Sequence, residues 1–267
     1  MTTHRTIAGV RAALVPLRVG SVGLVPTMGT LHAGHEALVR RAGGECDVVV
    51  ASIFVNPAQF GPGEDFERYP RDEEQDTALA ASWGVDRLFV PPVEEMYPDG
   101  FGTWVEVGDL GDELEGAVRP GHFRGVATVC LKLFNIVRPE RAYFGQKDAQ
   151  QAAVLERMAR DLNLGLEIRV VPTVRDADGL AVSSRNAYLS PEEREAAAAL
   201  PRALAEGLKA GPERAAEVAR AALAREPRLE PDYIEVARLN GRVYLLAAAR
   251  VGTTRLIDNV VLEGDLE

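Results

Sequence analysis

The sequence predicts an α/β protein, with a doubly wound parallel-sheet domain followed by a smaller α+β domain. Residues 47–55 form a continuous apolar run, which is typical of a strand buried on both faces of a parallel sheet. Short apolar runs alternate with helical patterns as far as residue 171, and that alternation indicates a Rossmann-like order. After Pro172 the alternation stops. A chain of 267 residues can hold two cores, so we predict domains at 1–172 and 173–267.

The elements of the first domain follow from the apolar spacing. Strands are expected at residues 21–25, 47–55, 87–90, 141–144 and 166–171. Helices are expected to begin at residue 34 and to cover 72–83, 124–137 and 149–162. Residues 26–31 are expected to form a turn with a glycine hinge. Ligands of such sheets bind beyond the carboxyl ends of the strands, so polar motifs there are candidate sites.

The second domain begins with a helix signal. Ser190-Pro191-Glu192-Glu193 is a capping box with proline at the first helical position, and an alanine-rich helix follows it. A further helix is expected at about 213–224. Strands at 233–237, 243–247 and 255–257 would form a small antiparallel sheet. We expect this domain to close over the active site.

Composition excludes several classes of protein. The net charge of −10 argues against a nucleic-acid partner, which usually needs a basic surface. The longest apolar run, 48–55, is too short to cross a bilayer, and the first twenty residues lack a signal-peptide core. Cys46 and Cys130 give no disulfide framework. We therefore expect a cytoplasmic protein without a membrane or nucleic-acid partner.

His32 and His35 lie between the first strand and the first helix of the sheet domain. A helix N-terminus presents unpaired N–H groups and attracts phosphate, and two imidazoles three residues apart would point the same way. Gly34 has no Cβ, so a ligand could lie close to the backbone. The pattern predicts a phosphate site. Two other interpretations are a metal site completed by carboxylates and a pair of helix-capping histidines.

Polar side chains also follow the second strand and the next helix start. Asn56 and Gln59 offer amides that could hold a hydroxyl and a carboxylate, although Asn56-Pro57 could equally be a turn. Asp76 lies within the expected helix 72–83. On the sequence alone it is equally well explained as a solvated carboxylate on the helix face.

Lys147 is one of three lysines among 30 basic residues, which makes its place in a polar motif informative. Gly145 would permit a tight turn, Lys147 would supply a charge for phosphate, and Asp148 could cap the following helix. Asp148 and Gln151 could also be a capping pair without function. Further on, Ser183, Ser184 and Arg185 offer two hydroxyls and a guanidinium in a polar, mobile loop that could grip phosphate charge.

These strings together resemble one family. PTMGTLHAGH, residues 26–35, is similar to the HxGH signature of nucleotidyl-transferring α/β proteins and, more narrowly, to the pantothenate synthetase family. SIFVNPAQF, RPGHFRGV, GQKDAQQ and VSSRN follow in the family's order, and the resemblance runs over about 25–194, with little specific in the last seventy residues. Gln146 stands where the family usually has Glu. Because the amide of glutamine has the same shape as the carboxylate of glutamate, we expect little loss of activity.

The resemblance implies an ATP-dependent ligase that joins pantoate to β-alanine through a pantoyl adenylate, with Mg²⁺, as a homodimer. It implies that His35, His32, Lys147 and Arg185 are catalytic and that Asp76 helps to place the metal. The residues that it implies for ATP binding are Met28, Gly29, His32, Gly34, His35, Gly145, Lys147, Asp148, Val174, Val182, Ser183, Ser184 and Arg185. Those that it implies for pantoate or β-alanine are Asn56, Gln59, Gln151, Arg119 and His122. Arg119 and His122 could instead have a structural role in a turn and helix cap.

Two alternatives to this function stay open at this point. The chain could be another HxGH adenylyltransferase that acts on a different acid or on a phosphate ester. It could also be a nucleotide-binding module without catalysis, although the intact set of histidines, lysine and Ser-Ser-Arg argues against that. AMP production that depends on both pantoate and β-alanine separates the three.

Overall fold

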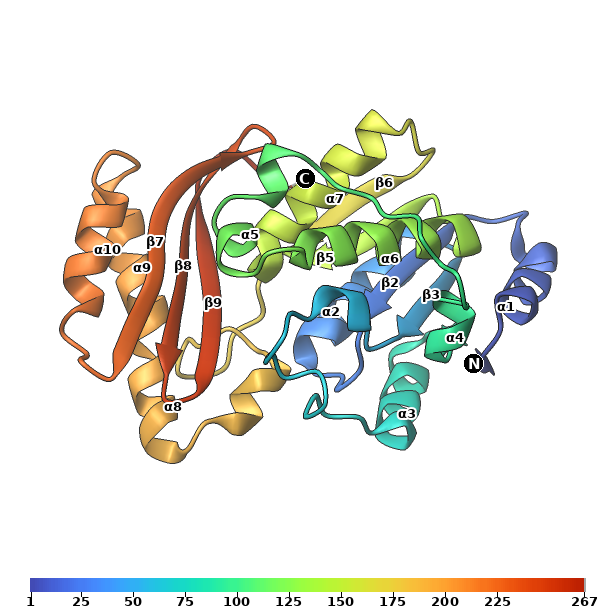
Figure 1. Ribbon diagram of the computed structural model, residues 1–267, viewed down its shortest axis with the longest axis horizontal. Coiled ribbons are helices and arrows are strands. Elements are labelled where there is room, and N and C mark those ends of the chain that lie inside the picture. The colour runs from blue at the N-terminus through green and yellow to red at the C-terminus, as the bar shows by residue number, and fades with distance from the viewer. Residues whose placement is uncertain (267) are drawn as a thin grey trace. The chain divides into compact units, whose positions relative to one another are not determined.

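The computed structural model describes residues 1–266, which divide into two compact units (Figure 1). The N-terminal unit comprises Met1–Phe144 and Gln150–Val171. The C-terminal unit comprises Gly145–Ala149 and the chain from Pro172 onward. Over the described range, no helix is both long and apolar enough to cross a membrane.

The N-terminal unit contains a six-stranded sheet of order β1-β4-β3-β2-β5-β6, whose recorded pairings run parallel. The strands are β1 (Thr2–His4), β2 (Val22–Thr27), β3 (Val48–Ile53), β4 (Arg87–Phe89), β5 (Arg141–Gly145) and β6 (Glu167–Val171). The strand order reverses at β2, so the predicted doubly wound sheet is confirmed. The three-residue strand β1 was not predicted, because its sequence is too short to show a period.

Helices cover this sheet on both faces. They are α1 (Ile7–Leu14), α2 (Ala33–Glu45), α3 (Glu73–Trp83), α4 (Val93–Met96), α5 (Glu115–Val118), α6 (His122–Val137) and α7 (Ala149–Asp161). Both α2 and α6 contact the central strand β2, and α6 crosses in front of the strands in Figure 1. Every residue of β3 is buried, which confirms the interpretation of the apolar run 47–55. Helices α1, α4 and α5 were not predicted.

Strand β2 continues two residues beyond its predicted end. Pro26 and Thr27 pair with β3, whereas the pairing of β2 with β5 includes only Gly23 and Leu24. Proline lacks the N–H that a central strand needs, but β2 is paired on one side only at Pro26, where proline is tolerated. The predicted turn 26–31 therefore starts later, at Met28.

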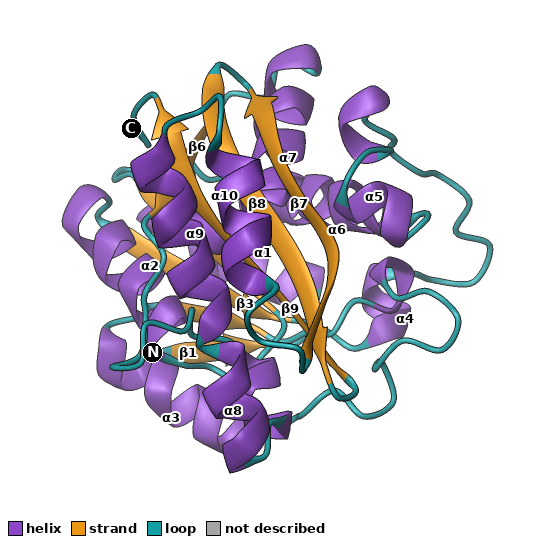
Figure 2. Cartoon of the chain, turned by 90° about the vertical axis from the view of Figure 1, so that its left-hand side faces the viewer, coloured by secondary structure: helices purple, strands orange, loops and turns teal. Residues whose placement is uncertain are grey.

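The C-terminal unit has a three-stranded antiparallel sheet of order β7-β8-β9 (Figure 2). Its elements are α8 (Pro191–Ala197), α9 (Ala199–Ala210), α10 (Ala215–Leu223), β7 (Leu229–Leu239), β8 (Arg242–Val251) and β9 (Thr254–Glu263). Helices α9 and α10 pack against each other and against the sheet. The predicted capping box at Ser190 is present. The strands are longer than predicted because backbone pairing continues through polar residues such as Glu230 and Arg250, which hydropathy does not reveal.

Candidate functional site

The two histidines of the β2–α2 turn lie face to face. Their ring centroids are 4.0 Å apart and the planes are inclined by 28°. His32 Nδ1 accepts the N–H of Gly34 at 3.1 Å, and His35 Nδ1 accepts the N–H of His32 at 3.3 Å. A neutral imidazole that accepts at Nδ1 carries its proton on Nε2. The backbone therefore prepares both rings as hydrogen-bond donors at Nε2.

This geometry confirms one expectation for the turn and corrects another. The capping interpretation is confirmed, because His32 and His35 form a reciprocal capping box, and the same bonds set the tautomers that a phosphate site needs. The expectation that the helix N-terminus offers unpaired N–H groups is wrong for Gly34, whose N–H already binds His32. A Cβ on Gly34 would lie 2.9 Å from His32 Cε1, so the glycine makes room for that ring.

Asp76 of α3 holds the same turn through hydrogen bonds to its backbone. Its Oδ2 accepts the N–H of Thr30 at 2.8 Å and its Oδ1 accepts the N–H of Leu31 at 2.7 Å. Gly29 and Thr30 both have positive φ, +87° and +53°, and a Cβ on Gly29 would lie 2.8 Å from Asp76 Oδ2. Asp76 is 3% exposed, so its interpretation as a solvated carboxylate is wrong. Burial raises the pKa of Asp76, and the two backbone N–H bonds oppose that rise.

The donor set around Asp76 is compatible with Mg²⁺ carried by phosphate. Each Asp76 oxygen accepts one N–H and keeps a second lone pair. Mg²⁺ commonly binds one or two carboxylates together with phosphate oxygens and water. Within residues 1–266 there is no group of three or more His, Cys, Asp or Glu side chains arranged to hold a metal ion. The metal interpretation of the two histidines therefore gains no support.

Buried amides follow β3 and connect to the histidine turn. Asn56 is 1% exposed and Gln59 is 9% exposed. Asn56 Nδ2 donates to Gln59 Oε1 at 3.0 Å and to the carbonyl of Gly125 at 3.2 Å, and Asn56 Oδ1 accepts from Tyr97 Oη at 2.8 Å. Gln59 Nε2 lies 3.1 Å from Met28 Sδ. The sequence did not single out Tyr97, because no motif connects it to Asn56.

The turn interpretation of Asn56-Pro57 is also confirmed. Asn56 Oδ1 accepts the N–H of Ala58 at 3.3 Å and so caps a 3₁₀ helix, Pro57–Gln59. A Cβ on Gly125 would lie 2.2 Å from the carbonyl oxygen of Ala58. Only glycine allows α6 to approach this short helix so closely.

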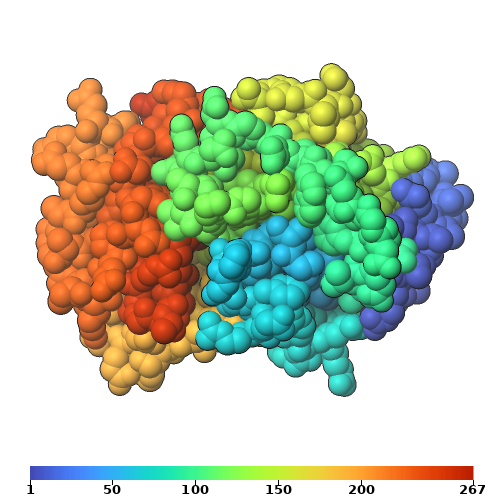
Figure 3. All heavy atoms as spheres, in the orientation of Figure 1, coloured from blue at the N-terminus to red at the C-terminus, as the bar shows by residue number. Residues whose placement is uncertain are grey.

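Arg119 and His122 hold the backbone of Gln59. His122 Nδ1 donates to the Gln59 carbonyl at 2.9 Å, and His122 Nε2 accepts from Arg119 Nη1 at 3.1 Å. Two further bonds, of 2.6 and 2.8 Å, join Arg119 to Glu64. On the face drawn in Figure 3, a light-blue segment of the N-terminal unit lies against a green segment of the same unit. Arg119 and His122 therefore support Gln59, and sequence reasoning missed Glu64.

The charges of this cluster explain its titration. Burial and the Arg119 guanidinium lower the pKa of His122 to about 4, so the ring is neutral near pH 7. Burial by itself would raise the pKa of Glu64, but its two bonds to Arg119 hold that pKa below the ordinary value. The neutral His122 can therefore donate to a carbonyl at one nitrogen and accept from a guanidinium at the other.

Lys147 belongs to the C-terminal unit, on a 3₁₀ helix, Gln146–Asp148, that directly follows β5. Its Nζ lies 3.8 Å from Asp148 Oδ1, and its side chain is 19% exposed. Asp148 is the last residue of this 3₁₀ helix, and over residues 1–266 its carboxylate contacts Lys147 and accepts no capping N–H. The expectation that Asp148 caps the following helix is therefore wrong, and so is the alternative in which Asp148 and Gln151 form a capping pair.

Two neighbours of this segment also differ from expectation. Gly145 has an extended backbone, with φ −80° and ψ 139°, so the predicted tight turn does not require glycine there. Gln151 is half-buried on the first turn of α7. Its neighbour Gln150, which is 3% exposed, bonds to the backbone of the α5 region.

The Ser-Ser-Arg segment forms a capped 3₁₀ helix, Ser184–Tyr188, in the C-terminal unit. Ser183 is its N-cap and accepts the N–H of Arg185 at 3.3 Å. Just before it, the N–H of Val182 donates to the carbonyl of Val174 at 3.0 Å. Ser183, Ser184 and Arg185 are half-buried, and the chain here is a short 3₁₀ helix where the sequence predicted a loop.

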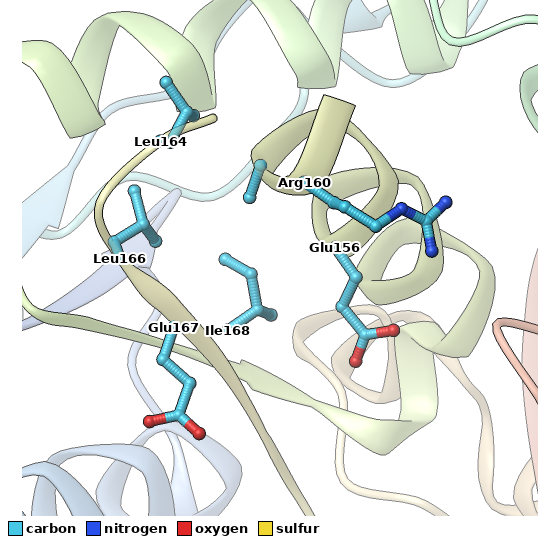
Figure 4. Close-up of a pocket in the computed structure, with 7 residues that line it drawn as sticks. Glu156, Arg160, Leu164, Leu166, Glu167 and Ile168 are labelled. Atoms are coloured by element: carbon cyan, nitrogen blue, oxygen red, sulfur yellow. The ribbon is translucent and has the colours of Figure 1, made fainter. Parts of the chain in front are cut away.

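A separate hollow of about 250 Å³ lies between α7 and β6 (Figure 4). Its walls are mostly aliphatic, with Leu164, Leu166 and Ile168, and Glu156 and Arg160 stand at its rim. It contains none of the residues that the sequence analysis selected, and we assign it no function.

Comparison with known proteins gives matches along the whole chain. The family profile described as pantoate-beta-alanine ligase matches residues 2–261. A pantothenate synthetase from Moorella thermoacetica is 57% identical over 281 residues, which cover 98% of this chain and 99% of that protein.

Two solved structures are similar over almost their full length. Pantothenate synthetase from Thermus thermophilus has a TM-score of 0.94 at 50% identity, covering 99% of this chain and 100% of that one. Pantoate-beta-alanine ligase from Francisella tularensis, complexed with beta-gamma ATP and beta-alanine, has a TM-score of 0.85 at 35% identity and covers all of both chains. The similarity thus includes the last seventy residues, where the sequence motifs had ended.

Proposed function

The chain belongs to the pantoate–β-alanine ligase family, and from that premise we propose how its own residues carry out the reaction. It is an enzyme that ligates pantoate with β-alanine in an ATP-dependent reaction. This activity is favoured over the other two candidates, a different HxGH adenylyltransferase and a module without catalysis.

The first step of the proposed mechanism is adenylation. A pantoate carboxylate oxygen attacks the α-phosphorus of ATP, the bond to the β-phosphate oxygen breaks, and pyrophosphate leaves. Such a transfer needs positioning and neutralisation of charge rather than a covalent protein nucleophile. In the second step the β-alanine amine attacks the acyl carbon, AMP leaves as the C–N bond forms, and the nitrogen loses its extra proton.

The observation that carries this assignment is the pair of preset imidazoles. His32 and His35 accept backbone N–H groups at Nδ1, so each neutral ring carries its proton on Nε2, where it can donate to a phosphate oxygen. We assign these donors to the phosphate oxygens of ATP, with His35 as the principal donor when charge builds up during transfer. Met28, Gly29 and Gly34 form the backbone of the same nucleotide-binding turn.

The C-terminal unit contributes cationic and hydroxyl groups to ATP. We assign Lys147 and Arg185 to the phosphates as they gain charge, and the hydroxyls of Ser183 and Ser184 as further donors. The backbone next to the lysine, serine and arginine side chains is assigned to the same nucleotide site, at Gly145, Asp148, Val174 and Val182. The 19% exposure of the Lys147 side chain supports this role, because a partly desolvated ammonium acts more strongly on a nearby phosphate.

Pantoate is assigned to the buried amides. Asn56 and Gln59 offer hydrogen bonds without charge, and Gln151 is assigned to the same substrate. Arg119 and His122 are positioning residues in this scheme, since they act through the backbone of Gln59. Because Glu64 already pairs with Arg119, the guanidinium is less suited to bind a substrate carboxylate directly.

We further propose that Mg²⁺ accompanies ATP and that Asp76 is its candidate protein ligand. When bound, Mg²⁺ would neutralise phosphate charge. An Asp76→Asn variant should then need more Mg²⁺ for half-maximal activity, measured by titrating Mg²⁺ at fixed ATP. An unchanged Mg²⁺ requirement would leave Asp76 with its role in the turn alone.

The decisive experiment for the mechanism is isotope exchange. Labelled pyrophosphate should exchange into ATP when pantoate is present and β-alanine is absent, because the acid is activated before the amine reacts. Exchange that strictly requires β-alanine would rule out the adenylate.

Two wider proposals follow from the resemblance. The protein acts in the cytoplasm, and the free thiols of Cys46 and Cys130 are compatible with a reducing compartment. It forms a homodimer, which light scattering at micromolar concentration tests directly.

A further inference from the structure

The last strand of the C-terminal unit carries two adjacent polar side chains that are almost completely buried. Asp258 is 2% exposed and Asn259 is 1% exposed, and both lie on β9. Neither belongs to a motif of the sequence. Buried polar groups are costly unless they are hydrogen-bonded, so their partners show what this strand holds in place.

Asn259 holds the segment that carries Lys147. Its Nδ2 donates to the carbonyl oxygens of Gln146 at 2.8 Å and of Lys147 at 3.0 Å. Its Oδ1 accepts from Gln146 Nε2 at 3.2 Å. Both protons of the amide nitrogen are therefore used on consecutive carbonyls. One side chain thus fixes the backbone from which the Lys147 ammonium extends.

Asp258 holds the segment that leads to the Ser-Ser-Arg helix. Its carboxylate forms two bonds with Arg175, of 2.6 and 2.9 Å, in the bidentate geometry that is strongest for this pair. Arg175 Nη1 also donates to the carbonyl of Gly179 at 3.0 Å, and the backbone of Arg175 pairs with Ala181. These contacts close a hairpin whose second arm ends just before Ser183.

The two contacts are joined within the strand, because the N–H of Asn259 donates to Asp258 Oδ1 at 2.8 Å. We propose that Asp258 and Asn259 are positioning residues for adenylation, which hold the Lys147 turn and the Ser183–Arg185 segment from one strand. This inference rests on the proposed function, in which those groups bind ATP phosphates. Strand β9 would then affect the rate of adenylation without touching the substrates. A misplacement of a phosphate-binding group by about 1 Å can lower a rate about a hundredfold.

The test is pantoate-dependent pyrophosphate exchange in an Asn259→Leu variant. Leucine has the same number and branching of side-chain heavy atoms as asparagine but removes all three side-chain bonds. The exchange kcat should fall about tenfold to a hundredfold and the KM for ATP should rise. The KM for pantoate should stay unchanged, because its assigned residues lie in the N-terminal unit. Asn259→Ser, which is too short to reach both carbonyls, should give a smaller loss in the same constants and serves if the leucine variant does not fold.

Leu256→Ala is the matched control, because Leu256 is a buried apolar residue of the same strand. It should lower the melting temperature and leave both KM values unchanged. The inference is overturned if the folded Asn259 variants exchange like the parent, or if Leu256→Ala reproduces their kinetic losses at an equal melting temperature. A parent enzyme that shows no pantoate-dependent exchange would instead contradict the proposed function.

Discussion

The histidine turn and the Lys147 turn serve the same nucleotide in the proposed mechanism, but they are supported in different ways. His32 and His35 are held by backbone N–H groups within three residues, and Asp76 supports their turn from the next helix along the chain. Lys147 depends on Asn259, which is 112 residues away. The residues that hold the two histidines therefore lie mostly within or near their own motif. The motif around Lys147 contains the reactive group, but the residue that holds its backbone lies elsewhere in the sequence.

Removal of the ammonium should have the largest effect. Lys147→Met keeps much of the side-chain packing but loses the attraction to phosphate, so adenylation should fall by about two to four decades. Lys147→Arg should recover only part of this, because the charge returns in a different shape. Single-turnover formation of pantoyl adenylate measures the change.

Lys209→Met is the control for that series, since Lys209 is an exposed lysine at the end of α9. It should react like the parent. If Lys147→Met is folded by thermal melting and equally fast, Lys147 has no part in the phosphate site.

Loss of the His35 ring tests the locally supported turn. His35→Ala should lower adenylation about a hundredfold or more, because a preset donor to the phosphates is removed. It should also cost about 1 kcal/mol of stability, since the ring caps the helix. Pyrophosphate exchange and urea unfolding separate the two effects, with Arg40→Ala on the exposed face of α2 as control. A stable His35→Ala variant with the parent rate would leave only the capping role.

The pH dependence of stability should reveal the His122 cluster. An unfolded histidine takes up a proton near pH 6.5, whereas His122 in the folded chain stays neutral down to about 4. The neutral His122 ring therefore contributes fully to the free energy of unfolding above pH 6.5. This contribution is lost as pH falls toward 4, by up to about 3 kcal/mol. Urea unfolding at several pH values should show this loss in the parent and a smaller one in His122→Asn. Parallel curves for the two proteins would contradict the burial of a neutral ring.

The smallest effect is expected from Gln146→Glu. The carboxylate can still accept the N–H of Thr173, which lies 3.4 Å from Gln146 Oε1, but it has no proton to donate to Asn259. Adenylation should fall less than about tenfold, in line with the loss of one hydrogen bond. Steady-state exchange measures it. A loss as large as that of Lys147→Met would mean that the amide does more than orient the turn.

Much of the sheet domain could be predicted because its signals are local. The continuous apolar run at 47–55 indicates a strand covered on both faces, and the alternation of strand and helix indicates parallel pairing. The histidine spacing is equally local, since residues three apart on a helix turn necessarily come close. By contrast, Pro26 ended the predicted strand too early, because sequence does not show how far pairing continues on each side.

The sequence by itself determined the fold class, the order of the motifs and the reactive groups, since these depend on residue type and short-range spacing. Only the tertiary structure decided which groups hold them. Three such residues lie outside the sequence motifs: the buried carboxylate Asp76, the paired carboxylate Glu64 and the buried amide Asn259. Each forms hydrogen bonds with residues that are distant in the sequence and come close only after folding. The physical reason is that a hydrogen bond depends on distance in space, and sequence patterns report distance along the chain.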